Sequence, residues 1–460
     1  MAKRTKIPLY LLCAATLILA TTVLLQLGGA LHRESDQDYL SLLRQVRGII
    51  KNSFVEKVSD KQLTESAVNG MLAALDPHSA YLPPEPFKEM NIQLAGSFGG
   101  VGIEISIKEG KLTVISPIED TPAYRAGIKA GDHIWKIDGK PTAGLSITDA
   151  VNRMRGEKGT KVVLAILREG SKAPLVFPLV RDIIKTHSLK SATLEPGFGY
   201  IKIGHFQQLT ADEFGQALKR LHAENRGTLQ GLIIDLRNNP GGALDPAIKV
   251  AGYFIGVGFS DGLIVSTRGR IPSASREFSA SIGEKEPAYP VVVLINGGSA
   301  SASEIVAGAL QDHGRAVIMG TQSFGKGSVQ SIIPLRNGAG LKLTTALYYT
   351  PKGRSIQAKG ITPDIVVPQF DLATATKRSS ASLREQNLPN HLAPDSPSAP
   401  PDSRRQEEST PSPKPLAPLS PHIPQGDLSH DYQAVRALEL LKGLSKTKEV
   451  ALTQRGSSPP

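Results

Sequence analysis

The chain has 460 residues, 40% of them hydrophobic, and a formal net charge of +11 at pH 7. This length allows two or three domains, each with its own core. The single cysteine, Cys13, lies in an N-terminal apolar run, which excludes a disulfide framework and cysteine chemistry in the rest of the chain. Lysines and arginines are scattered among acidic residues without a basic block interleaved with aromatics, so we expect no nucleic-acid partner.

Residues 1–33 begin with basic side chains and continue as an uncharged run from Ile7 to Leu31. A run of this length can span a bilayer, and positive charges before it favour a body on the outer side. We therefore predict that the protein is exported to, or anchored on, the extracytoplasmic (periplasmic) side of a membrane. The small residues 28–30 resemble a cleavage site, so a removed signal peptide, a retained anchor and a buried core helix all stay open.

Residues 36–95 have apolar side chains at helical spacing, for example Leu40, Leu43 and Val46, and predict a small helical N-terminal domain. Its last part carries the helix breakers Asp76-Pro-His-Ser79, which we interpret as a structural turn.

Residues 96–185 alternate with period two, which predicts strands. The segments Phe98-Gly-Gly-Val-Gly-Ile-Glu-Ile105 and Ala126-Gly-Ile-Lys-Ala-Gly-Asp-His-Ile-Trp-Lys-Ile-Asp-Gly139 resemble a PDZ domain. Successive glycines let several backbone N–H groups point at one anion, and an edge strand beyond them can accept a peptide as an added strand. We expect a peptide's C-terminal carboxylate to bind at a loop of six residues: Phe98, Gly99, Gly100, Val101, Gly102 and Ile103.

Residues 186–370 alternate short apolar strands with helices, which predicts an α/β core. Residues 371–428 are rich in Ser and Pro and too poor in apolar residues to offset the entropy of ordering, so we predict a disordered linker. Helical spacing returns in residues 429–446, which predicts an amphipathic helix docked on the body or on a second copy of the chain. A homodimer or higher oligomer stays open.

Three segments of this core carry the chemistry: Asp235-Leu-Arg-Asn-Asn-Pro-Gly-Gly242, Asn296-Gly-Gly-Ser-Ala-Ser-Ala-Ser-Glu304 and Ser323-Phe-Gly-Lys-Gly-Ser-Val-Gln330. With the PDZ-like pattern they resemble the carboxyl-terminal processing proteases, also called tail-specific proteases. The resemblance implies a multidomain α+β fold with a helical N-terminal domain, a PDZ domain and a ClpP/crotonase-like α/β serine protease core. It also implies a serine endopeptidase without metal or organic cofactor, acting on proteins with apolar C-terminal tails.

The same resemblance implies the catalytic residues. Ser301 is the nucleophile, Lys326 the general base and Gln330 the residue that orients the lysine. A lysine acts as a base only when neutral, so its pKa must fall from ~10.4 towards ~7 through burial. Asp312 competes for the third role, but eleven helical residues place it about 16 Å from the nucleophile, so we interpret it as a structural acid.

An oxyanion needs two preorganised N–H donors, one of them usually from the residue after the nucleophile. That residue is Ala302, and either Gly241 or Gly242 is expected to supply the second donor. Arg155, at the end of the PDZ helix, is a candidate for coupling tail capture to the active site through an acidic partner.

Some of these sequence features also fit other interpretations. Ser301-x-x-Glu304 is also a capping-box pattern, in which the serine only caps a helix. Gly320-x-x-x-x-Gly-Lys-Gly327 misses the Ser or Thr of a phosphate-binding loop, and the histidines lack metal-ligand spacing, so we expect neither nucleotide nor metal. A catalytically inactive PDZ scaffold and an acyl-thioester enzyme of crotonase-like architecture are the alternative functions.

Overall fold

The computed structural model describes residues 36–256, 262–281, 285–371, 376–377, 383–393 and 431–456. The chain divides into two compact units between Ala74 and Leu75. The predicted export segment, residues 1–33, and most of the predicted linker lie outside the described residues. Among the described residues, no helix combines the length and the apolar character that a membrane span requires.

The first unit is helical where it is described. Residues 36–53 form one helix, and α2 (Asp60–Ala73) follows. Ser59 caps α2, because its hydroxyl accepts the Gln62 N–H, which satisfies one of the free donors of the first turn.

The second unit begins with β1 (Ala80–Leu82) and α3 (Pro84–Ala95). β1 pairs antiparallel with β18 (Gly340–Tyr349). Residues 75–95 thus fall in the second unit, whereas the sequence placed them with the helical N-terminal domain. A three-residue strand owes its identity to a partner more than 250 residues away, so local spacing cannot reveal it.

The PDZ-like module consists of short antiparallel strands and two helices. Its elements are β2 (Ser97–Gly100), β3 (Ile103–Lys108), β4 (Lys111–Pro117), α4 (Pro122–Arg125), β5 (His133–Ile137), β6 (Lys140–Pro141), α5 (Ile147–Met154), β7 (Lys161–Leu167), β8 (Leu175–Val180) and β9 (Asp182–Lys185). The main sheet has the order β3-β4-β5-β7-β8, with β6 on β5. β2 and β9, the first and last strands of the module in sequence, pair with each other as a separate two-stranded ribbon.

The core contains two sheets. The larger has the order β10 (Leu189–Glu195), β11 (Phe198–Ile203), β12 (Gly231–Asp235), β15 (Val291–Ile295), β16 (Val317–Gly320) and β19 (Ile365–Val366). It is parallel except for β10. The second sheet is antiparallel and joins β1, β18, β13 (Leu263–Gly269) and β14 (Arg276–Ser279), with β17 (Ser328–Pro334) on β18. Smaller elements are η2 (Pro272–Ala274) and the hairpin of β20 (Phe370–Asp371) and β21 (Thr376–Lys377).

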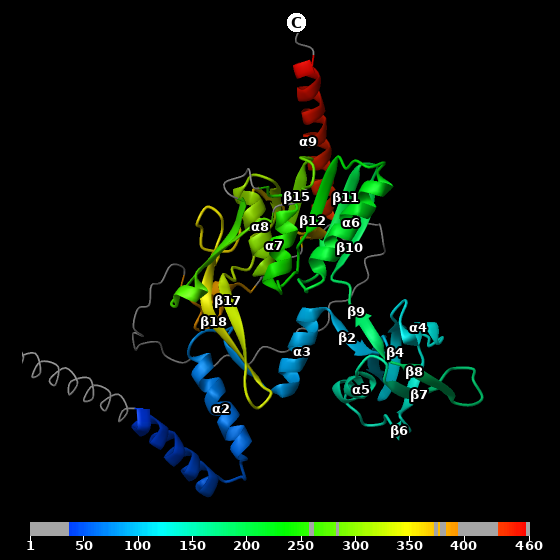
Figure 1. Cartoon of the computed structure of the whole chain (residues 1–460), viewed down its shortest axis with the longest axis vertical. Coiled ribbons are helices and arrows are strands. Elements are labelled where there is room, and N and C mark those ends of the chain that lie inside the picture. The colour runs from blue at the N-terminus through cyan, green and yellow to red at the C-terminus, as the bar shows by residue number, and fades with distance from the viewer. Residues whose placement is uncertain are drawn as a thin grey trace, which may run out of the picture. The chain divides into compact units, whose positions relative to one another are not determined.

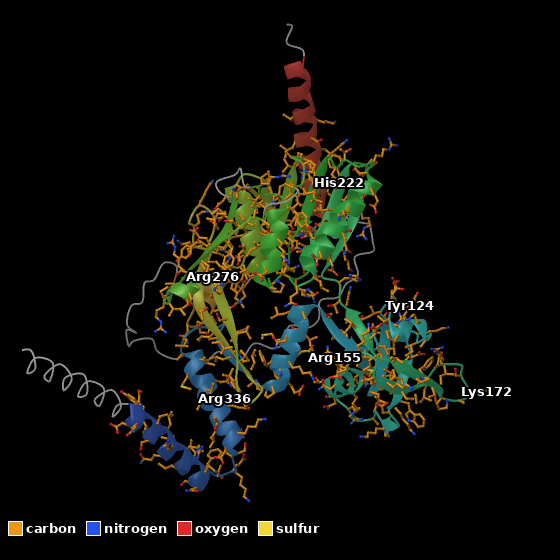
Figure 2. The ribbon with its side chains drawn as sticks, viewed as in Figure 1. Tyr124, Arg155, Lys172, His222, Arg276 and Arg336 are labelled. Carbon is orange, nitrogen blue, oxygen red and sulfur yellow. The ribbon has the colours of Figure 1, made fainter. Side chains whose placement is uncertain are left out.

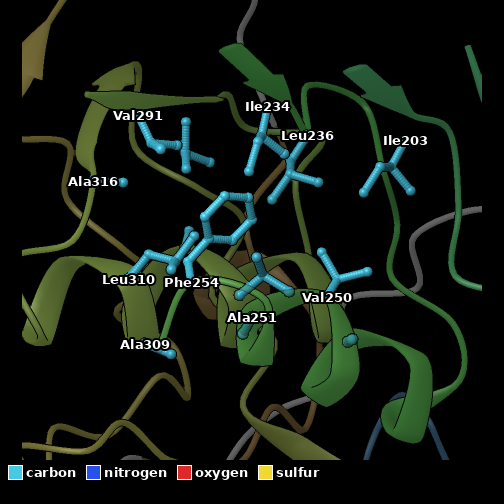
Figure 3. Packing of buried hydrophobic residues seen from close by; sticks show 14 of the residues in the cluster. Ile203, Ile234, Leu236, Val250, Ala251, Phe254, Val291, Ala309, Leu310 and Ala316 are labelled. Atoms are coloured by element: carbon cyan, nitrogen blue, oxygen red, sulfur yellow. The ribbon is translucent and has the colours of Figure 1, made fainter. Parts of the chain in front are cut away.

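Helices cover both faces of the larger sheet (Figure 1). α6 (Thr210–Glu224), α7 (Leu244–Gly252) and α8 (Ala302–Asp312) lie on one face. Successive side chains of a strand point to opposite faces, so Ile234 packs with the α7 residues Val250 and Ala251 (Figure 3), whereas Ile233 faces the other side. Because both faces of the larger sheet are buried, its strands are apolar along their length and do not alternate between apolar and polar residues.

The other face is covered by α9 (Tyr432–Gly456), shown in red in Figure 1. Ala434, Ala437 and Leu441 are buried there. The buried Arg237 guanidinium donates to the Asp431 carboxylate before the helix. The helix thus docks on the body, one of the two surfaces that its spacing left open, and ends ten residues beyond the predicted boundary of 446.

Residues 383–393 differ from the expectation of a disordered linker. They include η3 (Glu385–Asn387), and the Glu385 side chain is fully buried. Composition predicts disorder only where no tertiary contact stabilises the segment, and here specific polar contacts do so.

Candidate active site

Ser301 occupies the corner between β15 and α8. All five residues of β15 are buried, and α8 begins at Ala302. Ser301 has a φ of 55°, a left-handed conformation that costs a residue other than glycine about 1–3 kcal/mol. A strained strand-to-helix corner is the setting in which α/β hydrolases carry their serine nucleophile.

The two serines that flank Ser301 fasten this corner. The Ser299 hydroxyl donates to the Leu236 carbonyl at 2.8 Å, and the Ser303 hydroxyl donates to the Asn239 carbonyl at 3.0 Å. Both side chains are fully buried. They tie the corner to the loop after β12, so their role in the structure is to hold the backbone around Ser301.

Gly241 and Gly242 lie in that same loop. A Cβ on Gly241 would come within 2.9 Å of the Ser301 Cβ and 3.0 Å of the Ala302 nitrogen, so only glycine permits this approach. The Gly241 N–H already donates to the Asn239 side chain at 2.9 Å. No acceptor in the described part of the chain takes the Gly242 N–H, which makes Gly242 the better candidate for the second oxyanion donor.

Glu304 is a central residue that the sequence indicated only as a helix-capping partner. One carboxylate oxygen accepts the N–H groups of both Ser301 (2.8 Å) and Lys326 (2.9 Å). The other oxygen accepts the Ser323 hydroxyl (2.5 Å) and the Gly325 N–H (2.7 Å). Burial raises the pKa of Glu304 to about 7, although these four donors oppose the shift. One buried carboxylate therefore joins the backbones that carry Ser301 and Lys326.

Lys326 lies on the loop between β16 and β17. Burial is the main cause that lowers the pKa of its ammonium, the neighbouring Lys342 also lowers it, and Glu385, Glu304 and Asp76 raise it; the resulting pKa is about 8. Among the described residues, the ammonium has no hydrogen-bond or ion-pair partner. A lysine with this pKa is partly neutral near pH 8 and can accept a proton.

Gln330 lies on β17, and its amide forms no hydrogen bond with Lys326. Its Nε2 donates to the Ser328 hydroxyl at 2.9 Å and to the Thr344 hydroxyl at 3.3 Å. The predicted role of orienting the lysine thus has no direct hydrogen bond here, and Gln330 connects β17 to β18 instead.

The Asp76-Pro-His-Ser79 turn joins this network. The Asp76 carboxylate accepts the backbone N–H groups of His78 and Ser79 and the Ser79 hydroxyl at 2.6–3.0 Å. It also accepts the Thr344 hydroxyl at 3.0 Å. The turn is structural, as the sequence suggested, but it also supports the strand that faces Gln330.

The six residues predicted to bind a peptide carboxylate surround the start of the PDZ-like sheet. Phe98, Gly99 and Gly100 belong to β2, Val101 is buried, Gly102 has a φ of 78°, and Ile103 begins β3. Within the described residues, β3 pairs only with β4 and is thus an edge strand. An added peptide strand can extend this edge.

Arg155 follows α5 and has the acidic partner that the sequence analysis anticipated. Its guanidinium forms a two-pronged ion pair with Glu89 on α3 and lies 4.6 Å from the centre of the Phe98 ring; Figure 2 shows its place in the fold. The buried Arg155 Nε has no hydrogen-bond partner. Arg155 lines a cavity of about 360 Å³ with Glu89, Ile92, Gln93, Phe98, Thr186, His205 and Gln207.

Two further expectations concern residues outside this constellation. At the end of α8, Asp312 accepts the Lys352 N–H at 2.9 Å and pairs with Arg354, which gives it a structural role. Across the described ranges, His, Cys, Asp and Glu side chains form no group of three that could hold a metal ion.

Three family models match successive parts of the chain: the activating protease CtpB N-terminal domain over residues 26–85, a PDZ domain over 113–168, and peptidase family S41 over 197–367. The predicted combination of a helical N-terminal region, a PDZ domain and a mixed α/β protease core is thereby confirmed.

Individual relatives agree with these matches. A carboxy-terminal-processing protease from Bartonella bacilliformis is 48% identical over 75% of this chain and 78% of its own. Carboxy-terminal processing protease CtpB from Bacillus subtilis is 38% identical over 71% of this chain and 67% of its own. A solved photosystem II D1 C-terminal processing protease is 30% identical, with a TM-score of 0.40 over 69% of this chain and 84% of that one. The chain belongs to the carboxy-terminal processing protease family, with a PDZ domain and a peptidase family S41 core.

Proposed function

We propose that the protein is an exported serine endopeptidase that captures the C-terminal tail of a protein substrate and cleaves it with a Ser301/Lys326 dyad. The observation that carries this proposal is the shared Glu304 oxygen, which accepts the backbone N–H groups of both residues. The lowered pKa of Lys326, about 8, supports its role as base.

The proposed reaction uses both side chains. Neutral Lys326 accepts the hydroxyl proton of Ser301 while the Ser301 oxygen attacks the peptide carbonyl. The N–H groups of Ala302 and Gly242 stabilise the resulting oxyanion. The lysine ammonium then gives its proton to the leaving amine, and water hydrolyses the acyl-enzyme with Lys326 again acting as base. Gln330 contributes through the β17–β18 hydrogen bonds that hold the strand after the lysine.

Substrate choice lies in the PDZ domain. A tail that adds to the edge strand β3 places its carboxylate at the loop from Phe98 to Ile103, where backbone N–H groups bind it. Apolar side chains of the tail pack beside α5 in this proposal, so it includes a preference for an apolar C-terminus. The Arg155–Glu89 ion pair links this loop to α3 and is the proposed path by which tail capture affects cleavage.

Export rests on the basic residues followed by the apolar run from Ile7 to Leu31. The proposal places the body on the extracytoplasmic, periplasmic side, with residues 1–33 either removed or kept as a membrane anchor. Fractionation of cells that produce the full chain tests this, because a body that stays in the cytoplasm contradicts export.

The proposed activity is tested with one unfolded protein substrate in two forms, which end in an apolar or in a charged tail. The wild type is expected to cleave the apolar-tailed form faster, because only that tail has apolar side chains to pack beside α5. Ser301→Ala is expected to bind the apolar tail without cleaving. Failure of the wild type to cleave either form would favour the inactive PDZ scaffold.

A further inference from the structure

A second buried carboxylate, Glu385, lies beside the loop that carries Lys326. It belongs to residues 383–393, called the strap below, which lie beyond the region matched by peptidase family S41. The Glu385 side chain has no exposed surface. A carboxylate is buried in this way only where donors and cations compensate for the loss of water.

The strap holds the lysine loop on both sides of Lys326. The Glu385 backbone N–H donates to the Phe324 carbonyl at 3.2 Å. The Glu385 carboxylate accepts the side-chain N–H of Gln357 at 2.9 Å. The side-chain oxygen of Gln357 in turn accepts the Gly327 backbone N–H at 2.9 Å. Gln357 is itself fully buried, so these contacts fix the backbone before and after the lysine.

Glu385 also connects the lysine loop to the Asp76-Pro-His-Ser79 turn. His78 Nε2 lies 2.9 Å and 2.7 Å from the two Glu385 carboxylate oxygens. The backbone N–H of His78 donates to the Asp76 carboxylate. That carboxylate also accepts the Thr344 hydroxyl, whose oxygen accepts the Gln330 amide. The Glu385 side chain therefore connects Gln357, which holds the lysine loop, with the Asp76-Pro-His-Ser79 turn, which holds Thr344.

We propose that Glu385 is a positioning residue of the active site and that the strap completes the protease core. The inference rests on the proposed function, because it concerns the base of the Ser301/Lys326 dyad. In this arrangement the strap keeps the lysine loop in its working geometry, and the Glu385 charge favours the protonated lysine. The charged groups around Lys326 are Glu385, Glu304, Asp76 and Lys342.

Two substitutions separate position from charge. Glu385→Gln keeps the shape and an acceptor for Gln357 but removes the charge, so the limb on which kcat/KM rises with pH is expected to shift to lower pH by about 0.5 unit or more. Glu385→Ala also removes the acceptor, so kcat is expected to fall about tenfold or more with KM little changed, because the lysine loop is no longer held. Gln386→Ala is the matched control, since Gln386 is exposed in the same turn.

A second readout does not depend on activity. In a Ser301→Ala background, Glu385→Ala is expected to speed hydrogen exchange of the 323–331 amides, with no such change for Gln386→Ala. Wild-type kcat and pH profile in both Glu385 variants, together with unchanged exchange, would overturn the inference. A wild type that cleaves nothing would instead reject the proposed function, and the exchange measurement would still decide whether the strap holds the loop.

Discussion

The surroundings of Lys326 lower its pKa, so that more of the amine is neutral. Burial is the largest cause of its lowered pKa, and Lys342 on β18 lowers the pKa further by charge repulsion. Three carboxylates, Glu385, Glu304 and Asp76, act in the opposite direction. The resulting pKa of about 8 leaves a useful fraction of neutral base at mildly alkaline pH.

The pH profile of the enzyme is expected to depend on Lys342. In the wild type, kcat/KM is expected to rise with pH through about 8, because only neutral Lys326 accepts the serine proton. Lys342→Met removes a neighbouring cation, which raises the pKa of Lys326 and moves this limb to higher pH. Arg336→Met, on the exposed β17–β18 turn shown in Figure 2, is expected to leave the profile unchanged. A limb that stays in place in Lys342→Met contradicts the proposed electrostatics.

The motif residues could be predicted from the sequence because they lie in short segments with a characteristic order of residues. Ser301 and Lys326 were both indicated, although their roles remain proposals. Glu304 was seen only as a possible capping partner, since its contacts with Ser323 and Lys326 span 19 and 22 residues. The Asn239 contact that takes the Gly241 N–H depends on side-chain geometry, which no spacing pattern contains.

Among the elements, α9 shows how a distant segment stabilises the core. The spacing of its apolar residues indicated a docked helix, and the structure adds the surface on which it docks. Leu441 is fully buried against that surface, whereas Leu444 on the same helix is 37% exposed. The two leucines therefore provide a matched pair of substitution sites, one buried and one exposed on the same helix.

Leu441→Ala is expected to destabilise the core by about 2–5 kcal/mol, because it leaves a cavity beneath α9. This corresponds to a fall of about 5 °C or more in the Tm of the core transition, which calorimetry measures. Leu444→Ala is expected to change Tm far less. Equal effects of the two substitutions would show that α9 is not docked as described.

At the scale of the whole molecule, the order of helical region, PDZ domain and protease core was predictable, because each part has its own apolar period and its own glycine signature. The strap was not predictable. It is a short segment inside a Ser/Pro-rich stretch, and the contacts that hold it, such as those of Glu385 with His78 and Gln357, join residues far apart in the sequence. The β1–β18 pairing was missed for the same reason, since its partners are distant in sequence.

Coupling between the PDZ domain and the core is predicted to depend on Arg155. Arg155→Ala removes the ion pair with Glu89, so the advantage of the apolar-tailed substrate in kcat/KM is expected to fall about tenfold, as for the loss of a charge-assisted pair. Cleavage of the charged-tail form is expected to change little. Arg153→Ala, in the last turn of α5, is the control. An undiminished preference in Arg155→Ala would remove this residue from the coupling path.

Ser301 and Lys326 are proposed to act as one catalytic unit. The most direct test is the rate of cleavage of the apolar-tailed substrate by Ser301→Ala and by Lys326→Ala, with Lys172→Ala, an exposed PDZ lysine, as control. Both active-site variants are expected to lose about 10³-fold or more in kcat while they keep the wild-type Tm and tail binding, and the control is expected to match the wild type. Wild-type turnover by either Ser301→Ala or Lys326→Ala would contradict the account.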